Sequence, residues 1–230
     1  MNKTFVFAGA SSKTAIETAK LLQAQQHKVI GISTKPQSYP YDEFHVVDKY
    51  TFGTFPEISQ SIDGLVYFPG TIQLKPFQRI SEAEFFQDYH INTLGAVAFT
   101  QMYMGELKKR PGSAVVFVSS VAAQTGLPFH SSIAMAKAAL EGLTKSLAAE
   151  FAPTVRVNAI APSLTQTPLA EKFVNTPDKL DASHKRHPLK RIGEAVNLAN
   201  AIHFLLDEKS SWITGQVMAV DGGMSQLRLI

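Results

Sequence analysis

Seven short apolar runs recur along the chain, and longer segments separate them. The runs are rich in Val, Ile and Phe and show little alternation of apolar and polar residues. Such runs are typical of strands that are covered on both faces, as in a parallel sheet. They lie at residues 4–8, 28–32, 44–47, 64–68, 114–118, 155–160 and 217–220.

Amphipathic helical patterns fill several of the intervening segments, at residues 14–25, 82–108, 132–151 and 194–206. Ser81 and Glu84 have the spacing of a capping box at the start of the second pattern. Strands that alternate with helices form parallel sheets with helices on both faces. The chain therefore predicts a doubly wound α/β sheet of about seven strands. Because we find no repeat and no linker, we expect residues 1–230 to form one domain.

Two segments break this alternation. Residues 34–43 contain two prolines and no helical period, so we expect the second crossover to be a short loop. Residues 168–188 form another irregular region, between a strand and a helix. Long loops at the carboxyl ends of the strands usually line the ligand site of such sheets, which places this region near the expected site.

Composition excludes several classes of function. The chain has no cysteine, which excludes disulfides, thiolate metal sites and cysteine nucleophiles. Its net charge of +3 is too small to predict nucleic-acid binding. Its apolar runs are shorter than the roughly 18 residues of a membrane span, and the apolar stretch 5–10 is too short for a signal peptide. We expect a soluble cytoplasmic protein.

The first strand leads into the first helix through a loop that suits an anion. Gly9 permits a tight turn, and Ser11 and Ser12 offer hydroxyls and backbone N–H groups at a helix N-terminus. A pyrophosphate fits such a loop. The alternative is an ordinary strand–helix turn with a serine cap, because a standard dinucleotide loop contains more glycine.

Further motifs follow in order along the chain. Asn92 lies in H-I-N-T-L-G-A, within the second helical pattern, and Ser120 ends the apolar run V-V-F-V-S-S. Ile133 and Lys137 stand four residues apart in S-I-A-M-A-K, on one face of the third helical pattern.

The C-terminal third carries the most specific pattern. Residues 158–163 read N-A-I-A-P-S, which includes Pro162, and T-Q-T-P-L follows with Thr165 and Thr167. H-P-L-K-R-I-G-E-A, W-I-T-G-Q and V-D-G-G come next. Taken in this order, the motifs resemble those of the short-chain dehydrogenase/reductase family, from about residue 4 to residue 224.

The chain departs from the pattern of that family at several places. Lys13 and Ala15 replace the later glycines of the loop T-G-x-x-x-G-x-G, and Y-F-P-G, which ends at Gly70, replaces N-N-A-G. Ile133 stands where the family has the tyrosine of Y-x-x-x-K, and isoleucine can neither donate nor accept a proton. Cofactor binding is therefore the safer expectation, and ordinary alcohol or ketone turnover is the one that would fail first.

The resemblance implies roles for three residues. In the family the Lys holds the nicotinamide ribose, the Ser orients the substrate oxygen and the Asn completes a proton relay, which implies these roles for Lys137, Ser120 and Asn92. Each residue also has a plainer interpretation. Lys137 could be a solvated helix lysine, Ser120 a strand-ending serine in a turn, and Asn92 a surface or kink residue.

His130 is a candidate replacement for the tyrosine. It precedes Lys137 by seven residues, so it shares a face with Ile133 and Lys137 if the helix extends back to it. By resemblance, enoyl reductases of the same superfamily place their tyrosine at this offset from the lysine, and histidine can act as a general acid near neutral pH. The alternative is a loop histidine before a helix that Ser131 or Ser132 caps.

The end of the second strand favours NADP over NAD. Residues 33–35 read S-T-K, without an acid for a ribose diol, whereas Lys13 and Lys35 can both reach a 2′-phosphate. The alternative is that both are surface lysines. Asp48 matches the adenine-contacting aspartate of the family, or is a simple turn residue. The cofactor contacts that we expect besides Lys13 and Asp48 are Gly9, Ser11, Ser12, Thr14, Thr34, Gly70, Lys137, Pro162, Thr165 and Thr167.

Two functions stay open at this point. The first is an NAD(P)-dependent oxidoreductase in which water, His130 or a serine replaces the phenol. The second is a cofactor-binding protein without turnover, acting as a sensor or a partner subunit. Apolar side chains on the helical patterns 82–108 and 132–151 predict a homodimer or homotetramer. A small-molecule substrate in a partly apolar pocket is expected from Leu127, Phe129, Leu169 and Phe173.

Overall fold

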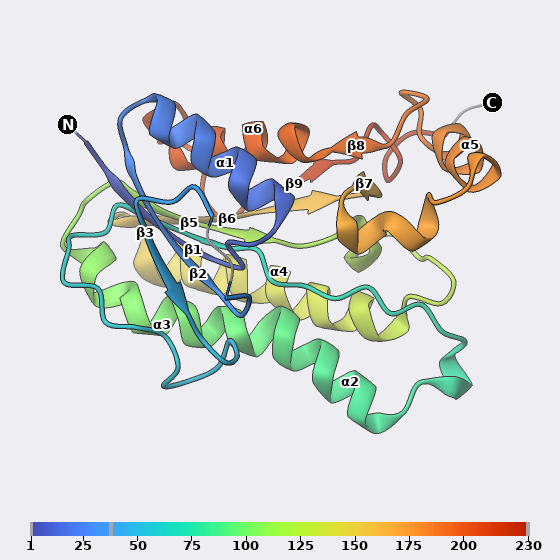
Figure 1. Ribbon diagram of the computed structural model, residues 1–230, viewed down its shortest axis with the longest axis horizontal. Helices are drawn as coiled ribbons and strands as arrows, with labels where there is room; N and C mark the ends of the chain where they lie inside the picture. The colour runs from blue at the N-terminus through green and yellow to red at the C-terminus, as the bar shows by residue number, and fades with distance from the viewer. Residues whose placement is uncertain (1, 37–38, 229–230) are drawn as a thin grey trace.

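The computed structural model describes residues 2–36 and 39–228, which are built around one parallel sheet (Figure 1). Its strands are β1 (Thr4–Ala8), β2 (Lys28–Ser33), β3 (Glu43–Val46), β4 (Gly64–Tyr67), β5 (Ser113–Val118), β6 (Val155–Pro162) and β9 (Val217–Val220). They follow the order β3-β2-β1-β4-β5-β6-β9, and all neighbours are parallel. The predicted doubly wound sheet is confirmed, and each predicted run overlaps one of its strands.

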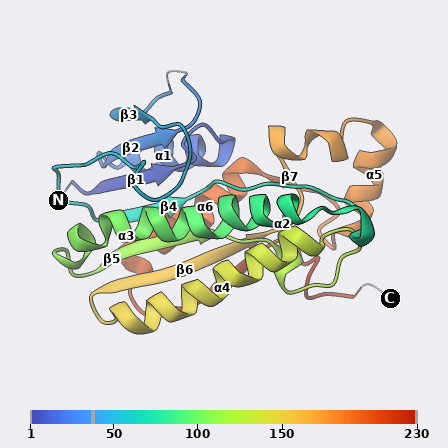
Figure 2. The same cartoon turned by 90° about the horizontal axis from the view of Figure 1, so that it is seen from below.

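Helices cover both faces of the sheet (Figures 1 and 2). One face carries α1 (Lys13–Ala24) and α6 (Ala195–Leu206), and the other carries α3 (Gly95–Lys108) and α4 (Ser131–Phe151), with α2 (Glu82–Tyr89) beside α4. Short 3-10 helices lie at η1 (Phe77–Arg79), η3 (Val121–Ala123) and η5 (Glu208–Ser210). Across the described residues, no helix combines the length and apolar character needed to span a membrane.

The central strands read as continuous apolar runs because they supply two cores. On β1, Phe5 and Phe7 belong to the core under α1 and α6, whereas Val6 and Ala8 belong to the core under α3 and α4. Successive side chains of a strand point to opposite faces, so a strand buried on both faces has few polar positions, and Arg156 and Asn158 on β6 are buried exceptions.

The prediction of one continuous helix over residues 82–108 is wrong. A π-helical segment, η2 (His90–Leu94), separates α2 from α3. The Tyr67 hydroxyl at the end of β4 donates to the Ile91 carbonyl over 2.7 Å. A side chain at Gly95 would collide with that hydroxyl, so a glycine is needed where α3 begins. Such π segments are frequent at functional sites, and this one carries the asparagine singled out above.

Capping residues set the starts of two helices. The predicted capping box is confirmed, because Ser81 N donates to Glu84 Oε2 over 3.0 Å and Glu84 N donates to Ser81 Oγ over 3.3 Å. At the start of α1, Ala15 N donates to Ser12 Oγ over 3.1 Å. The serine cap that was left as an alternative for the first loop is therefore present.

The two irregular segments have different outcomes. Between β2 and β3, the described residues 34–36 and 39–42 contain no helix, as expected, while Gln37 and Ser38 lie outside the described residues. The expectation for 168–188 is wrong, because this segment forms η4 (Pro168–Phe173) and α5 (Pro177–Arg186). Each of these helices has a proline in its first positions, where the missing N–H costs nothing.

A second, two-stranded ladder was not predicted. It pairs β7 (Thr165–Gln166) with β8 (Gly193–Glu194). Strands of two residues are too short to carry a periodic pattern, so the sequence gives no sign of them. This ladder, η4 and α5 lie near the end of the sheet toward which the arrow of β6 points (Figure 1).

Candidate functional site

The candidate site lies at the carboxyl ends of the central strands. From β1 the chain proceeds through β2 to β3 on one side, and it returns to β4 on the other side of β1. The strand order therefore reverses between β1 and β4, which is where open α/β sheets bind ligands. The loops after β1, β4, β5 and β6 carry most of the residues singled out from the sequence.

The loop after β1 turns sharply at Gly9. This residue has a φ of +75°, and a Cβ on it would stand 2.8 Å from Pro69 Cδ, so the turn requires a glycine. Ser12 N donates to Gly9 O over 3.0 Å and closes the turn. The first N–H groups of a helix have no partner within the helix. The amides of Lys13 and Thr14 at the start of α1 can therefore receive an anion.

The end of β2 lies beside this loop. Thr34 and Lys35 are exposed there, as is Asp48 after β3. The Tyr50 hydroxyl accepts the Thr34 N–H over 3.2 Å, and burial raises the pKa of this phenol. Tyr50 is thus a residue near the strand ends that the sequence analysis missed. Lys35 and the exposed Lys13 are free of ion pairs among the described residues.

Gly70, just after β4, brings two other candidates together. A Cβ at Gly70 would stand 3.2 Å from Asn92 Oδ1 and 3.4 Å from Lys137 Nζ. These residues come from a loop, from η2 and from α4, so the fold joins three segments that are distant in sequence. The absent side chain leaves a space bordered by an amide oxygen and an ammonium group.

Lys137 is buried in α4, with 4% of its surface exposed. The alternative of a solvated helix lysine is therefore wrong. Its Nζ donates to the Val118 carbonyl at the end of β5 over 2.7 Å. Burial lowers the pKa of Lys137 to about 7, and the negative charge of Asp88 opposes that shift. A base with this pKa exchanges protons readily near neutral pH.

Asn92 is fully buried in the π-helical segment, so the alternative of a surface residue is wrong. Its Nδ2 donates to Thr71 Oγ1 over 2.8 Å and to the Asp88 carbonyl over 2.8 Å. Thr71 N approaches its Oδ1 at 3.4 Å. The kink interpretation was correct in part, because the helix is interrupted here while the side chain also faces the candidate site.

Ile133 lies one turn before Lys137 on α4 and is 4% exposed. Ser120 follows β5, where its Oγ accepts the Ala122 N–H over 3.2 Å and caps η3. The turn interpretation of Ser120 thus describes its backbone contact. That contact uses a lone pair of the oxygen, and the hydroxyl proton remains available to a substrate.

The arrangement expected for His130 does not form. Helix α4 begins at Ser131, and His130 precedes it with φ −102° and ψ 12°, outside the helix. Its Nδ1 lies 2.7 Å from the Pro128 carbonyl. The prediction that His130 shares a helix face with Lys137 is therefore wrong. The expected serine cap is wrong too, because no side chain caps α4 and Ser132 donates to Asp88 instead.

The segments after β6 close the site on its other side. Pro162 ends β6, and Thr165 is buried in β7 with its hydroxyl donating to the Ser163 carbonyl over 3.1 Å. Thr167, half-buried, donates to the Thr165 carbonyl over 3.4 Å. These hydroxyls are engaged by nearby backbone, and each keeps lone pairs for a further partner.

The segment η4 reaches back to the loop after β4. Lys172 Nζ donates to the Ile72 carbonyl over 3.0 Å, which joins two loops 100 residues apart. Of the apolar residues expected in a substrate pocket, Leu127 and Phe173 are half-buried, whereas Phe129 and Leu169 are 55% and 50% exposed.

A polar cluster beside Asn92 was missed by the sequence analysis. Asp88 is fully buried, and its two carboxylate oxygens accept from Thr71 Oγ1 and Ser132 Oγ, each over 2.5 Å. The one available signal was an acid placed one helical turn before Asn92, which puts both side chains on one face.

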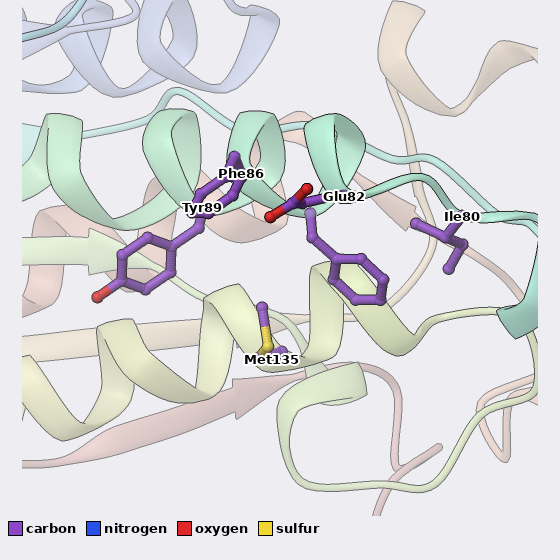
Figure 3. A pocket seen from close by; sticks show the side chains of 6 residues that line it. Ile80, Glu82, Phe86, Tyr89 and Met135 are labelled. Atoms are coloured by element: carbon purple, nitrogen blue, oxygen red, sulfur yellow. The ribbon is translucent and has the colours of Figure 1, made fainter.

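An apolar pocket of about 600 Å³ lies between α2 and α4, apart from these residues. Figure 3 shows its side chains, with Phe86 and Tyr89 on α2 and Met135 on α4. Phe86 is 64% exposed and Met135 49% exposed. The pocket is lined by Ile80, Glu82, Phe85, Phe86, Tyr89 and Met135, and none of these was expected in the site.

The residues at the strand ends fit a nicotinamide dinucleotide. The amides at the start of α1, with Ser11 and Ser12 half-buried beside them, suit a pyrophosphate. The space that a Cβ at Gly70 would fill lies against Lys137, where a ribose hydroxyl can meet the ammonium.

Comparison with known proteins finds reductases and dehydrogenases that are similar to this chain. Residues 49–225 match the family model described as enoyl-(acyl carrier protein) reductase. L-xylulose reductase of Bos taurus is 36% identical over 165 residues, which cover 70% of this chain and 67% of that protein. The 3-oxoacyl-[acyl-carrier-protein] reductase FabG of Thermotoga maritima is 36% identical over 165 residues, which cover 71% of this chain and 66% of that protein. The chain thus spans about two thirds of the length of these relatives.

The similarity extends to solved structures. Ligand-free aldohexose dehydrogenase of Thermoplasma acidophilum superposes with a TM-score of 0.88 at 27% identity. The superposition covers 100% of this chain and 96% of that chain.

Proposed function

Because the chain belongs to the short-chain dehydrogenase/reductase family, we propose that it is an NADP-dependent oxidoreductase that works without a phenol as proton donor. The observation that carries this proposal is the grouping of Gly70 with the buried Asn92 and Lys137 around one space. Burial of an ammonium group is costly because the group loses its hydration. A lysine without a ligand to bind would gain nothing from burial at this place.

The proposed cofactor contacts follow the strand ends. The loop after β1 takes the pyrophosphate through the amides and hydroxyls of Ser11, Ser12, Lys13 and Thr14. The exposed Lys13 and Lys35 favour a 2′-phosphate, hence NADP over NAD. The other residues that would hold the cofactor are Gly9, Thr34, Asp48, Gly70, Lys137, Pro162, Thr165 and Thr167.

The cofactor would supply hydride exchange with a carbon of the substrate. In our proposal Lys137 provides the proton, because its pKa of about 7 makes its ammonium a competent acid near neutral pH. The Ser120 hydroxyl orients the substrate oxygen, and Asn92 borders the lysine and takes part in its reprotonation from water. His130 remains a second donor candidate only if its loop moves toward Lys137.

The substrate is proposed to be a small molecule with a carbonyl, or with an activated imine or alkene that needs less acid catalysis. The loss of the phenol costs at most about 10²–10⁴-fold in rate, which an activated substrate can tolerate. The half-buried Leu127 and Phe173 support a partly apolar substrate.

The second candidate function is a cofactor-binding protein without turnover. It is favoured by Ile133, which is buried where the family has its acid and cannot take part in proton transfer.

One experiment separates the two functions. The protein is titrated with NADPH and NADH, and hydride transfer is then assayed with a panel of ketones, imines and enones. Turnover on any of them supports the oxidoreductase. Tight NADPH binding without turnover supports the second function, and the lack of binding to either nucleotide contradicts both.

We further propose that the chain forms a homodimer or homotetramer through α2, α3 and α4. Phe86, Met102 and Met135 expose 64%, 41% and 49% of their surface on these helices, while Phe99 and Leu140 are core residues. Light scattering should give a multiple of the 25.1 kDa chain mass, and a charge introduced by Met135→Glu should reduce it. A wild-type mass of one chain would contradict this assembly.

A further inference from the structure

Asp88 on α2 forms hydrogen bonds with side chains of two other segments, the loop after β4 and α4. Its Oδ1 accepts from Thr71 Oγ1 after β4, and its Oδ2 accepts from Ser132 Oγ on α4, each over 2.5 Å. Asp88 is 0% exposed and Ser132 is 1% exposed. A carboxylate buried to this degree is costly unless hydrogen bonds and a nearby positive charge compensate it.

The hydrogen bonds to Asp88 determine which group donates and which accepts between Thr71 and Asn92. A carboxylate only accepts, so the single proton of the Thr71 hydroxyl is given to Asp88. The Thr71 oxygen must then accept from its other partner, which is Asn92 Nδ2 at 2.8 Å. The amide of Asn92 is thereby held with Oδ1 toward the space at Gly70, which Lys137 Nζ also borders.

This orientation has a chemical consequence for Lys137. An amide oxygen beside an ammonium group is attractive, whereas an amide NH₂ in its place would repel it and could not accept its proton. Without the carboxylate, the Thr71 hydroxyl is free to donate to Asn92, and the amide is then held in this direction by the Asp88 main-chain carbonyl without the support of Thr71.

Asp88 also contributes its charge. Its carboxylate is the one ionisable group in the described residues whose charge raises the pKa of Lys137 against the effect of burial. The hydrogen-bond partner of Lys137 is the neutral Val118 carbonyl. Asp88 therefore favours the ammonium form of the lysine, and no second acid on the facing elements shares this effect.

The same geometry excludes a direct role for Asp88 in chemistry. Both of its oxygens are engaged and neither reaches solvent, so a substrate cannot touch them. Ser132 precedes Ile133, yet its hydroxyl turns to α2 rather than to the strand ends. These residues act through Asn92 and Lys137.

We propose that Asp88 is a positioning residue, which sets the amide direction of Asn92 through Thr71 and supplies a buried negative charge to the cluster that contains Lys137. The proposal rests on the proposed function for its catalytic meaning. Its physical content concerns only the protein without ligand and is testable without turnover.

The first test follows Lys137 itself. The protein is labelled with ¹³C at the lysine Cε, the Lys137 signal is assigned by its loss in Lys137→Met, and its titration is followed by NMR in wild type and in Asp88→Asn. We expect the titration midpoint to fall by about one pH unit in Asp88→Asn. The matched control is Asp181→Asn on exposed α5, which should leave the midpoint unchanged.

The second test separates the effect of Asp88 on the orientation of the Asn92 amide from the effect of its charge on Lys137. Thr71→Val removes the hydroxyl and keeps the Asp88 charge, whereas Thr71→Ser restores the hydroxyl. We expect Thr71→Val to raise hydrogen exchange of the Asn92 side-chain amide at least tenfold, and Thr71→Ser to return it near the wild-type rate. If turnover exists, kcat should fall with Thr71→Val more than KM rises.

The outcomes are distinguishable from failure of the proposed function. A wild type without NADPH binding or turnover contradicts that function and leaves both NMR tests in force. An unchanged Lys137 midpoint in folded Asp88→Asn overturns the charge role, and unchanged Asn92 exchange in Thr71→Val overturns the direction role. If circular dichroism shows Asp88→Asn unfolded, Thr71→Val and Thr71→Ser decide the proposal alone.

Discussion

The two ends of the candidate site are built in opposite ways. Around Lys137 the side chains are buried and joined by short hydrogen bonds, as at Asp88 and Asn92. Around Lys13 and Lys35 the side chains are exposed and carry no ion pair among the described residues.

The two ends should therefore tolerate sequence change to different extents. A substitution in the exposed loop leaves its neighbours with water as a partner, so a lysine can stand there in place of a glycine. A substitution in the buried cluster leaves an unpaired polar group, which costs far more. We therefore expect changes at the buried end to affect both stability and function, and changes at the exposed end to affect only affinity for the cofactor.

The largest effect is expected from Lys137→Met, which breaks the buried end. It should lower any turnover at least about 100-fold, because both the proposed ribose contact and the proposed proton donor are lost. It should also stabilise the fold at low pH. Burial lowers the folded pKa of Lys137 to about 7 from its usual 10.5, so the desolvation cost is fully present below pH 7.

The sign of the pH dependence makes this prediction specific. Between pH 7 and 10.5 the unfolded chain holds a proton that the folded chain lacks, so wild-type stability gains about 1.4 kcal/mol per pH unit from this group. The advantage of Lys137→Met should therefore shrink between pH 7 and pH 9. Urea unfolding at pH 6, 7 and 9 measures it, and a constant difference would contradict a depressed pKa.

The next largest effect is expected from restoring the phenol. Ile133→Tyr should raise kcat about 10–100-fold on a ketone, because it adds a positioned acid one turn before Lys137. Ile133→Phe is the matched control, since it adds the ring without the hydroxyl and should give no gain. A gain from Phe equal to that from Tyr would show that packing, rather than proton donation, limits the wild type.

The sequence predicted the sheet well because its signal is local. Each strand has to be apolar on both faces, so its pattern is visible in a window of five residues, as at Phe5 and Phe7 on β1. The burial of Lys137 was also predictable from its apolar helix. These features depend on composition within one segment.

The features that the sequence did not predict depend on partners far along the chain. Asp88 meets Thr71 and Ser132, which are 17 and 44 residues away. The π-helical break depends on the Tyr67 hydroxyl, 24 residues from Ile91. Helix α5 was missed because residues 168–188 were expected to be irregular, and its Pro177 stands at the helix start, where proline is tolerated.

A moderate effect is expected at the exposed end. Lys35→Ala and Lys13→Ala should each weaken NADPH binding about tenfold, because each removes one charge-assisted contact with a 2′-phosphate. NADH binding should hardly change, and neither variant should shift the melting temperature. Lys145→Ala on the exposed face of α4 is the control. Equal losses for NADPH and NADH would place the lysines at the pyrophosphate instead.

The smallest effect is expected from His130→Ala. This variant tests whether the proton donor is His130, outside α4, or a residue of the buried end. His130 lies outside α4 and its Nδ1 is turned to the Pro128 carbonyl, so it is not aimed along the helix face toward Lys137. We expect kcat and NADPH affinity to change less than about twofold, which is within the range of surface substitutions. A loss of turnover with NADPH affinity retained would instead make His130 the proton donor. The loop before α4 would then have to move on substrate binding, and the acid would come from the exposed part of the site rather than from its buried interior.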